Sequence, residues 1–257
     1  MIQKNERRSY ASDMSDSQWA IIEPLFPRAG NRSKWEKREL VNAVLYLIDN
    51  GCKWRNLPHD FPPYTTVANF YYAAIRSGLW EKLRAALVER VRTDAGRDAG
   101  PSYAIIDSQS VKTSSAAEER GIDGGKKTKG RKRHIVVDTM GDLLAVVIHA
   151  TNIHDTKAGI WAAKKAFETY PSIQRFCADA GYRKTFEQDV SGVLGLGVDI
   201  SVRIKPEWEV LPKRWIVERS LAWINNSRRL SKDYEISVCS AQAICTIAAF
   251  RTLLKRF

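Results

Sequence analysis

Three acidic residues, Asp107, Asp179 and Glu218, carry the side chains in this sequence that are best suited to chemistry. Asp107 follows a short apolar run in "SYAIIDSQSV", Asp179 lies in "FCADAGYRKTF", and Glu218 lies in "KRWIVERSLAWINNSRRL". Hard divalent cations prefer carboxylate oxygens, and two such ions about 3.5–4 Å apart activate a water or a hydroxyl and stabilise the leaving oxygen of a phosphodiester. If the three carboxylates converge, the sequence therefore predicts metal-dependent phosphodiester chemistry.

The two aspartates each stand at the end of a predicted strand. Side chains alternate along a strand, so a residue at its carboxyl end can point into a crevice that is shared with neighbouring strand ends. We therefore expect Asp107 and Asp179 to close their strands and to face one site. For either aspartate taken alone, a turn or helix-capping role is the more common one, and this alternative stays open.

Helical periodicity places Glu218 on a charged face. At about 100° per residue, the residues that fall within roughly 40° of one line are Arg214, Glu218, Ala222, Asn225 and Arg229. A single acid between arginines suits a metal ligand beside a phosphate backbone, so Arg214, Asn225 and Arg229 are candidate contacts to DNA. An ordinary solvated face is the alternative.

The charge of the chain favours a polyanionic partner. The sequence has 41 Lys and Arg against 29 Asp and Glu, a formal net charge of +12, and neutralising phosphates releases condensed counterions. Six cations lie within eight residues of "GGKKTKGRKRH": Lys126, Lys127, Lys129, Arg131, Lys132 and Arg133. We expect this segment to be a loop between strands that becomes ordered on phosphates, with Lys112 nearby, and Lys126 to Lys129 to contact the backbone without sequence preference. A solvated or targeting run is the alternative.

The pattern of apolar residues from Tyr103 onward predicts a mixed sheet. Strands are expected at 103–107, 133–139, 143–150, 173–179 and 198–204, and helices near 155–169, 182–190, 213–229 and 238–256. The turn "DTMGDL" joins the second and third strands as a hairpin, because Gly141 permits a positive φ. This order predicts an α/β fold with helices on the faces of the sheet.

The N-terminal residues 13–92 are predicted to be helical, and the Gly- and Asp-rich segment 92–102 is the best linker candidate. A proline-bent connection precedes a helix that Thr65 or Thr66 is placed to cap. That helix carries Asn69, Tyr71, Tyr72 and Arg76. A helix-turn-helix DNA reader and a helical packing domain with Trp54, Phe70 and Trp80 in its core are equally consistent with these residues.

Several residues point to the environment of the protein rather than to its site. Cys52, Cys177, Cys239 and Cys245 follow no disulfide or metal pattern, so reduced and mostly packed thiols are expected. A charged N-terminus and the lack of a long apolar stretch predict a cytoplasmic protein. His154 is a candidate accessory group near a phosphate, although a structural role is the stronger reading, and Asp155 is expected to cap the helix that follows.

With these residues laid out, the chain resembles bacterial insertion-sequence transposases of the DDE type, in particular family five of the insertion sequences. "IIDSQSVKT", "ADAGY" and "RWIVERSLAWINNSRRLSKDYE" resemble the three acidic blocks of that group, and "GCKWRNLPHDFPPYTTVANFYY" resembles its helical DNA-binding segment. The likeness runs nearly from end to end of the chain. It implies an RNase H-like fold, dependence on two Mg²⁺ or Mn²⁺ ions, and catalytic roles for Asp107, Asp179 and Glu218.

The chain departs from the wider transposase pattern at two positions. Leu211 stands where related families place a Tyr, and Asn225 stands where they place a Lys, so those phosphate contacts cannot be carried over. Arg228 or Arg229 is a candidate substitute. Asp179 and Glu218 are too close in sequence for a large insertion domain between them, so the cleavage pathway is left open.

The expected protein has two parts, a helical DNA-binding domain at 1–95 and an RNase H-like catalytic domain at 100–257. The resemblance implies a nucleoid-associated enzyme that binds the double-stranded ends of its own element, cuts them and transfers the freed 3′-hydroxyl to target DNA, as a homodimer or larger assembly. A transposase-derived regulator without catalysis and a structure-directed nuclease are the alternatives. The terminal repeat and the target sequence cannot be read from these residues.

Overall fold

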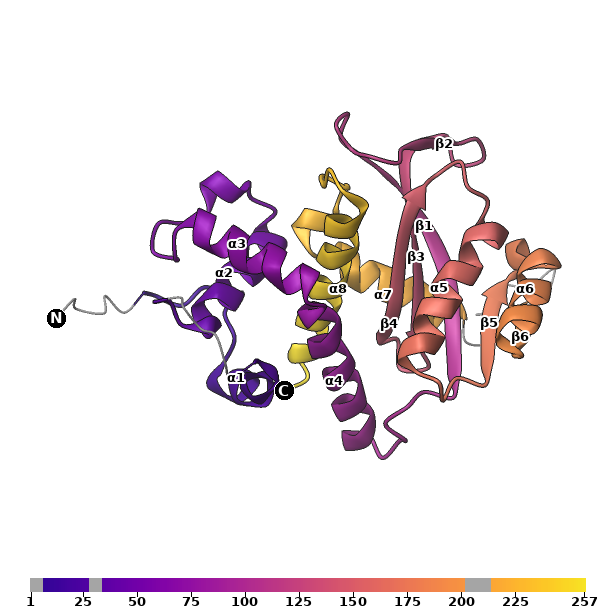
Figure 1. The fold of residues 1–257 in the computed structure, drawn as a ribbon, viewed down its shortest axis with the longest axis horizontal. Coiled ribbons are helices and arrows are strands. Elements are labelled where there is room, and N and C mark those ends of the chain that lie inside the picture. Colours follow the sequence, from indigo (N-terminus) through magenta and orange to yellow (C-terminus); the bar gives the residue numbers. More distant parts are fainter. Residues whose placement is uncertain (1–6, 28–33, 202–213) are drawn as a thin grey trace.

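The computed structural model describes residues 7–27, 34–201 and 214–257. Figure 1 shows the N-terminal helices on one side of a long C-terminal helix, α8 (Val238–Leu254), and a β-sheet on its other side. Within the described residues, none of the helices is long and apolar enough to cross a membrane.

The N-terminal part is helical, as predicted. Its elements are α1 (Asp16–Ile22), η1 (Glu23–Leu25), α2 (Lys37–Asn50), η2 (Trp54–Asn56), α3 (Tyr64–Arg76) and α4 (Leu79–Asp94). Ser15 and Gln18 form a capping box that starts α1, and Gly51 ends α2 in the left-handed conformation that glycine adopts without strain. The cap expected from Thr65 or Thr66 is wrong, because α3 already begins at Tyr64, directly after Pro63.

The second part of the chain forms a six-stranded mixed sheet. Its strands are β1 (Tyr103–Lys112), β2 (Gly121–Asp123), β3 (Thr128–Asp138), β4 (Leu143–Ala150), β5 (Arg175–Asp179) and β6 (Gly197–Ser201). β1 pairs antiparallel with β3, which pairs antiparallel with β2 and β4, whereas β1, β5 and β6 are parallel. The pairing confirms the mixed sheet that the sequence predicts.

Helices cover both faces of the sheet. They are α5 (Asp155–Thr169), α6 (Thr185–Leu194), α7 (Arg214–Asn225) and α8, with the short turns η3 (Ala180–Tyr182) and η4 (Arg228–Leu230). Neighbouring residues of β3 point to opposite faces: Lys132 meets Asp155 of α5, whereas Arg133 meets Asn225 of α7. The sheet therefore has an α5 face and an α7 face.

Helix α8 joins the two parts of the chain. It packs against α2, α3 and α4 on one side and against β4 and α7 on the other, and its side chains are buried along most of its length. The buried apolar residues of both parts form one continuous core. The proposed division at 95–100 thus separates two regions of sequence that share a hydrophobic core.

Two expectations for the extent of the strands are wrong. The basic run was expected to be a loop, but β3 begins at Thr128, so only residues 124–127 form the turn after β2. The first strand continues past Asp107 to Lys112. The predicted hairpin is confirmed, with Gly141 at φ +89° between β3 and β4, while 202–204 and residue 213 of the predicted elements lie outside the described residues.

Candidate active site

Asp107 and Asp179 occupy matching positions on the parallel strands β1 and β5. The parallel pairing of the two strands ends at Ile105 opposite Cys177, and each aspartate follows two residues later. Asp179 closes β5 as predicted, but Asp107 lies in the middle of β1, because β1 continues along β3 after its pairing with β5 has ended. The carboxylate of Asp107 thus lies at an edge created by the shorter neighbour.

The Asp107 carboxylate is largely buried. Its pKa is raised to about 6, mainly by burial and also by the nearby charge of Asp179. The backbone N–H of Ser108, which donates to Oδ1 at 2.7 Å, and the charge of Arg214 act in the opposite direction. Desolvation and a like charge both disfavour the ionised form. A cation at this position would remove that penalty.

Arg214 connects the other two acids. Its Nη2 lies 3.7 Å from Oδ2 of Asp179, and its Nε lies 3.2 Å from Oε1 of Glu218, one helical turn further along α7. Asp179 also accepts a hydrogen bond of 2.8 Å from the backbone of Gly181, so it serves as the turn-capping residue that its sequence context favours. The structure therefore brings Asp179 and Glu218 to one guanidinium, beside Asp107.

The donor set suits a hard divalent cation, although it is not assembled around one. Within the described residues, no group of three or more His, Cys, Asp or Glu side chains is arranged to hold a metal ion. The guanidinium of Arg214 lies where it neutralises Asp179 and Glu218, which is the electrostatic role that a divalent cation would fill. Three carboxylates with a stand-in cation therefore fit a hard divalent cation by charge and by ligand type.

The basic run is divided between solvent and interior. Lys126, Lys127 and Lys129 are exposed around the turn after β2 and remain candidates for phosphate contacts. Lys132 is nearly buried on the α5 face, where its Nζ lies 2.9 Å from Oδ1 of Asp155. Lys132 is thus held by an internal ion pair.

Arg131 and Arg133 correct the prediction that the run contacts phosphates directly. Their side chains are 0% and 1% exposed and point to the α7 face of the sheet. Arg131 pairs with Asp233 at 3.1 Å, and Arg133 donates to the Leu230 carbonyl at 2.9 Å. Both side chains are internal because they alternate along a strand instead of projecting from a loop.

The remaining candidate DNA contacts have different environments. Lys112 and Arg228 are exposed. Asn225 accepts a hydrogen bond of 3.3 Å from Arg133, while Arg229 pairs with Glu235 at 2.7 Å and donates to the Cys52 carbonyl at 2.8 Å. Arg229 therefore ties η4 to the N-terminal helices. Leu211 lies outside the described residues.

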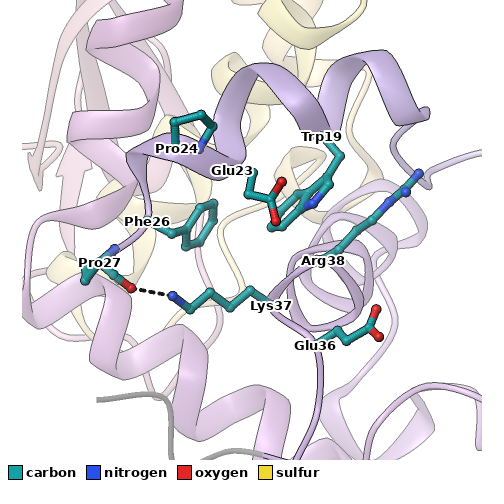
Figure 2. Close-up of a pocket in the computed structure, with 8 residues that line it drawn as sticks. All are labelled: Trp19, Glu23, Pro24, Phe26, Pro27, Glu36, Lys37 and Arg38. Atoms are coloured by element: carbon teal, nitrogen blue, oxygen red, sulfur yellow. Dashed lines mark hydrogen bonds between the residues drawn. The ribbon is translucent and has the colours of Figure 1, made fainter. Parts of the chain in front are cut away.

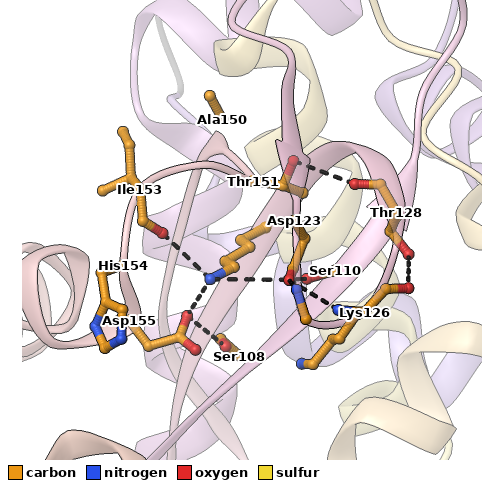
Figure 3. Close-up of polar contacts among 12 residues, drawn as sticks. Ser108, Ser110, Asp123, Lys126, Thr128, Ala150, Thr151, Ile153, His154 and Asp155 are labelled. Carbon is orange, nitrogen blue, oxygen red and sulfur yellow. Dashed lines mark hydrogen bonds and ion pairs between the residues drawn. The ribbon is translucent and has the colours of Figure 1, made fainter.

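The helix-capping role that was expected of Asp155 belongs to His154. The Nδ1 of His154 accepts a hydrogen bond from the backbone of Thr156, so His154 caps α5, whereas Asp155 is the first residue of that helix. Asp155 accepts a hydrogen bond of 2.9 Å from the hydroxyl of Ser108 (Figure 3), the residue that follows Asp107 in the sequence. Sequence reasoning missed this contact, although the alternation of β1 places Ser108 on the face opposite Asp107.

A hollow of about 680 Å³ lies away from the acids, between α1, η1 and the start of α2. Figure 2 shows Trp19 and Phe26 in it, with Lys37 reaching the Pro27 carbonyl. It contains none of the predicted site residues and adjoins in sequence the segment 28–33, which is outside the described residues. We assign no role to it.

Two curated proteins are similar to part of this chain. An uncharacterized protein, y4sN, of Sinorhizobium fredii is 29% identical over 44% of this chain and 87% of its own length. The insertion element IS402 uncharacterized 16.2 kDa protein of Burkholderia cepacia is 25% identical over 42% of this chain and 78% of its own length.

Two solved structures of Mos1 transposase have only a distant likeness. The paired-end complex with the left transposon end is 11% identical, with a TM-score of 0.25, and covers 67% of this chain, which spans 60% of that one. The strand transfer complex is 12% identical, with a TM-score of 0.26, over 90% of this chain and 78% of that one. Likeness at this level says nothing about the activity of this chain.

Family models cover both parts of the sequence. Residues 14–84 match the model described as "Putative transposase of IS4/5 family". Residues 98–253, more than half of the chain, match the model described as "Transposase DDE domain" and include Asp107, Asp179 and Glu218. The chain therefore belongs to the family of transposases with a DDE domain.

Proposed function

We propose that this transposase binds the ends of its own insertion sequence, cuts the DNA there and transfers the freed 3′-hydroxyl to a target strand. The observation that carries the proposal is the meeting of three acids: Asp107 beside Asp179 on parallel strands, and Glu218 joined to Asp179 through Arg214. The acids belong to elements far apart in sequence, and a basic protein that collects them at one place fits an enzyme acting on a phosphodiester.

Asp107, Asp179 and Glu218 are the residues that would hold Mg²⁺ or Mn²⁺. When bound, such ions activate the attacking oxygen and stabilise the leaving oxygen of a phosphodiester. Asp107 would be one of these ligands, because a cation beside its carboxylate would offset the cost of ionising it next to Asp179. If a cation neutralised Asp179 and Glu218, the guanidinium of Arg214 would be available to bind a DNA phosphate.

The N-terminal helices supply DNA binding in this proposal. On α3, Asn69, Tyr72 and Arg76 are exposed and lie three or four residues apart, so they share one face. Tyr71 belongs to the core, where its hydroxyl lies 2.9 Å from Oγ of Ser240. The exposed face of α3 is thus the candidate reader of a terminal repeat, while Lys126, Lys127 and Lys129 contact backbone phosphates.

Joining two ends requires two active sites, so we propose that the protein works as a homodimer or larger assembly on DNA. A regulator derived from a transposase would keep the DNA-binding face and would not need the three acids to converge. A nuclease with this fold would cut DNA without the transfer step. Both alternatives are separated from the proposal by experiment.

The test compares Asp107→Asn with Asp98→Asn, a change of an exposed aspartate outside the site. Each variant is assayed on DNA that carries the ends of the native element, with Mg²⁺ or Mn²⁺. We expect Asp107→Asn to lose cleavage while gel-shift affinity is kept or increased, because a negative charge near the phosphates is removed. Cleavage at the wild-type rate would overturn the assignment. Transfer of precut ends by the wild-type protein would exclude the nuclease, and failure to transfer them would favour it.

A further inference from the structure

Arg133 is a buried cation without a counter-ion. Its side chain is 1% exposed, its Nη1 donates to the Leu230 carbonyl at 2.9 Å and to Oδ1 of Asn225 at 3.3 Å, and its Nε has no hydrogen-bond partner. Among the described residues, no carboxylate forms an ion pair with it, in contrast to Arg131, which pairs with Asp233. A buried charge is costly unless an opposite charge lies near it. Arg133 therefore favours an anion on the surface next to it.

The groups that Arg133 contacts line a hollow on that surface. We call it the β1–α7 groove; its volume is about 390 Å³, and it is lined by Gln109, Ser110, Val111, Lys112, Thr128, Asn225, Leu230, Ser231 and Lys232. Its three hydroxyl groups, on Ser110, Thr128 and Ser231, already donate to Asp123 and to the Lys126 and Arg228 carbonyls. The other polar side chains of the lining are two lysines, an asparagine and a glutamine, with no Asp or Glu. Such a set of donors suits a phosphodiester backbone.

The two lysines of the groove are held in place by backbone pairing. The N–H of Asp233 donates to the Lys112 carbonyl at 2.9 Å, and the N–H of Ser114 donates to the Asp233 carbonyl at 3.2 Å. Arg131 supports this pairing from the interior through its ion pair with Asp233 and a hydrogen bond of 3.0 Å to the Glu235 carbonyl. The backbones of Lys112 and of Lys232, which precedes Asp233, are thus held next to each other before any ligand binds.

The groove begins directly beside the catalytic acids. Asp107, Gln109 and Val111 alternate along β1, so their side chains share one face of the sheet, and Gln109 pairs across to Arg133 on that face. The step from Asp107 to Gln109 is two residues, roughly 7 Å along the strand. Asn225 lies on the same helix as Glu218, two turns further on.

We propose that the β1–α7 groove binds the sugar-phosphate backbone of one DNA strand where it leaves the active site. Lys112 and Lys232 contact successive phosphates, and the buried charge of Arg133 attracts the strand from beneath. The proposal rests on the proposed function, because it takes DNA to be the substrate of the adjacent acids. It gives the buried arginines of the basic run a role that does not require them to touch phosphate.

The test measures DNA affinity against salt in the Asp107→Asn background, so that binding is read without cleavage. Lys112→Ala/Lys232→Ala is compared with Lys164→Ala/Lys255→Ala, which removes the same charge from exposed positions on α5 and after α8. Each lost phosphate contact lowers the slope of log K against log salt by about 0.9 for duplex DNA or about 0.7 for a single strand. We expect the groove variant to lose nearly two such contacts and the control to lose none.

A second measurement tests the position of the strand. Ser231→Cys is exposed at the groove, and Ser191→Cys is exposed on α6. We expect an oligonucleotide with a thiol tether on a phosphate next to the cleavage site to form a disulfide with Ser231→Cys and not with Ser191→Cys.

The proposal is overturned if the two double-lysine variants share one salt slope, or if cross-linking does not distinguish the two cysteines. A third outcome also overturns it: the groove variant binds inorganic phosphate more weakly, but its salt slope for DNA equals that of the control. The groove would then bind small anions and not DNA. These measurements do not depend on cleavage. Failure of the groove proposal can therefore be distinguished from failure of the proposed function, which the Asp107→Asn cleavage assay tests.

Discussion

Asp107 and Asp179 lie at matching positions on neighbouring parallel strands, each two residues past the last paired residues, Ile105 and Cys177. Two carboxylates held in this way repel each other, and burial of Asp107 adds to the cost of ionising it. The sheet therefore keeps an unfavourable charge where the pairing of β1 and β5 ends. Sites that bind cations commonly sacrifice stability in this way.

This arrangement predicts that Asp107→Asn stabilises the protein at high pH when divalent cations are removed. The folded-state pKa of Asp107 is raised to about 6 from 3.8, so the destabilisation is absent below about pH 4 and complete above about pH 6. Removing it should raise the free energy of unfolding by about 2–3 kcal/mol at pH 8. Urea unfolding in EDTA at pH 8 and pH 4.5 measures the difference, and an equal effect at both pH values would contradict the explanation.

Replacing Arg214 tests its role as a stand-in cation. In Arg214→Gln, divalent ions no longer compete with a guanidinium for Asp179 and Glu218. Two partly exposed ion pairs contribute about 0.2–1 kcal/mol each, so Mn²⁺ affinity without DNA should rise roughly 2- to 30-fold. Titration calorimetry measures it, with Arg228→Gln, an exposed arginine beyond α7, as the control. Equal affinities in wild type and Arg214→Gln would show that the guanidinium does not compete.

Gly141→Ala tests how α7 is held in place. At Gly141 the φ angle is +89°, and an added Cβ would lie 2.9 Å from Oγ of Ser220 and 3.0 Å from Nη2 of Arg219, two side chains that anchor α7 to this turn. We expect a loss of about 1–3 kcal/mol in urea unfolding, together with slower cleavage, because Glu218 lies next to the displaced residues. Gly192→Ala is the control, since it is helical with open space around it and should be neutral or stabilising.

Removing residues 1–95 tests the shared core. Without α2, α3 and α4, the buried residues on one side of α8 lose their cover. We expect the remaining chain to aggregate or to lose its near-UV circular dichroism, whereas the full chain nicked in the linker 96–99 should elute as one complex in gel filtration. A truncated chain with cooperative unfolding and native near-UV signal would show that the catalytic part folds alone.

The sequence predicts most of this fold, and its errors have physical causes. The helix at Asp155–Thr169 and the strand at Leu143–Ala150 follow from apolar periodicity and have the expected bounds. The strand after Asp107 was missed because Ser108 and Ser110 are polar, and their burial depends on Asp155 and Asp123 in other elements. No local pattern identifies such partners.

The candidate site was predictable to a similar extent. Alternation or helical spacing indicated where the three acids lie, and helical spacing also puts Arg214 beside Glu218. The contact of Arg214 with Asp179 could not be predicted, because it depends on how α7 packs against β5. The burial of Arg131 was not predictable, because its partner Asp233 lies 102 residues away. A run of cations has the sequence pattern of an exposed loop, and only the tertiary structure shows that alternate residues of this run pair with internal groups.

The central place of α8 also constrains the order of events during synthesis. Well over a hundred residues separate the end of α4 from the start of α8, so the N-terminal helices leave the ribosome on the order of ten seconds before the helix that completes their core. During that interval the nascent chain exposes the apolar side chains that α8 later covers. The mature packing of the N-terminal helices is therefore a late event of translation, reached only when the last described helix has emerged.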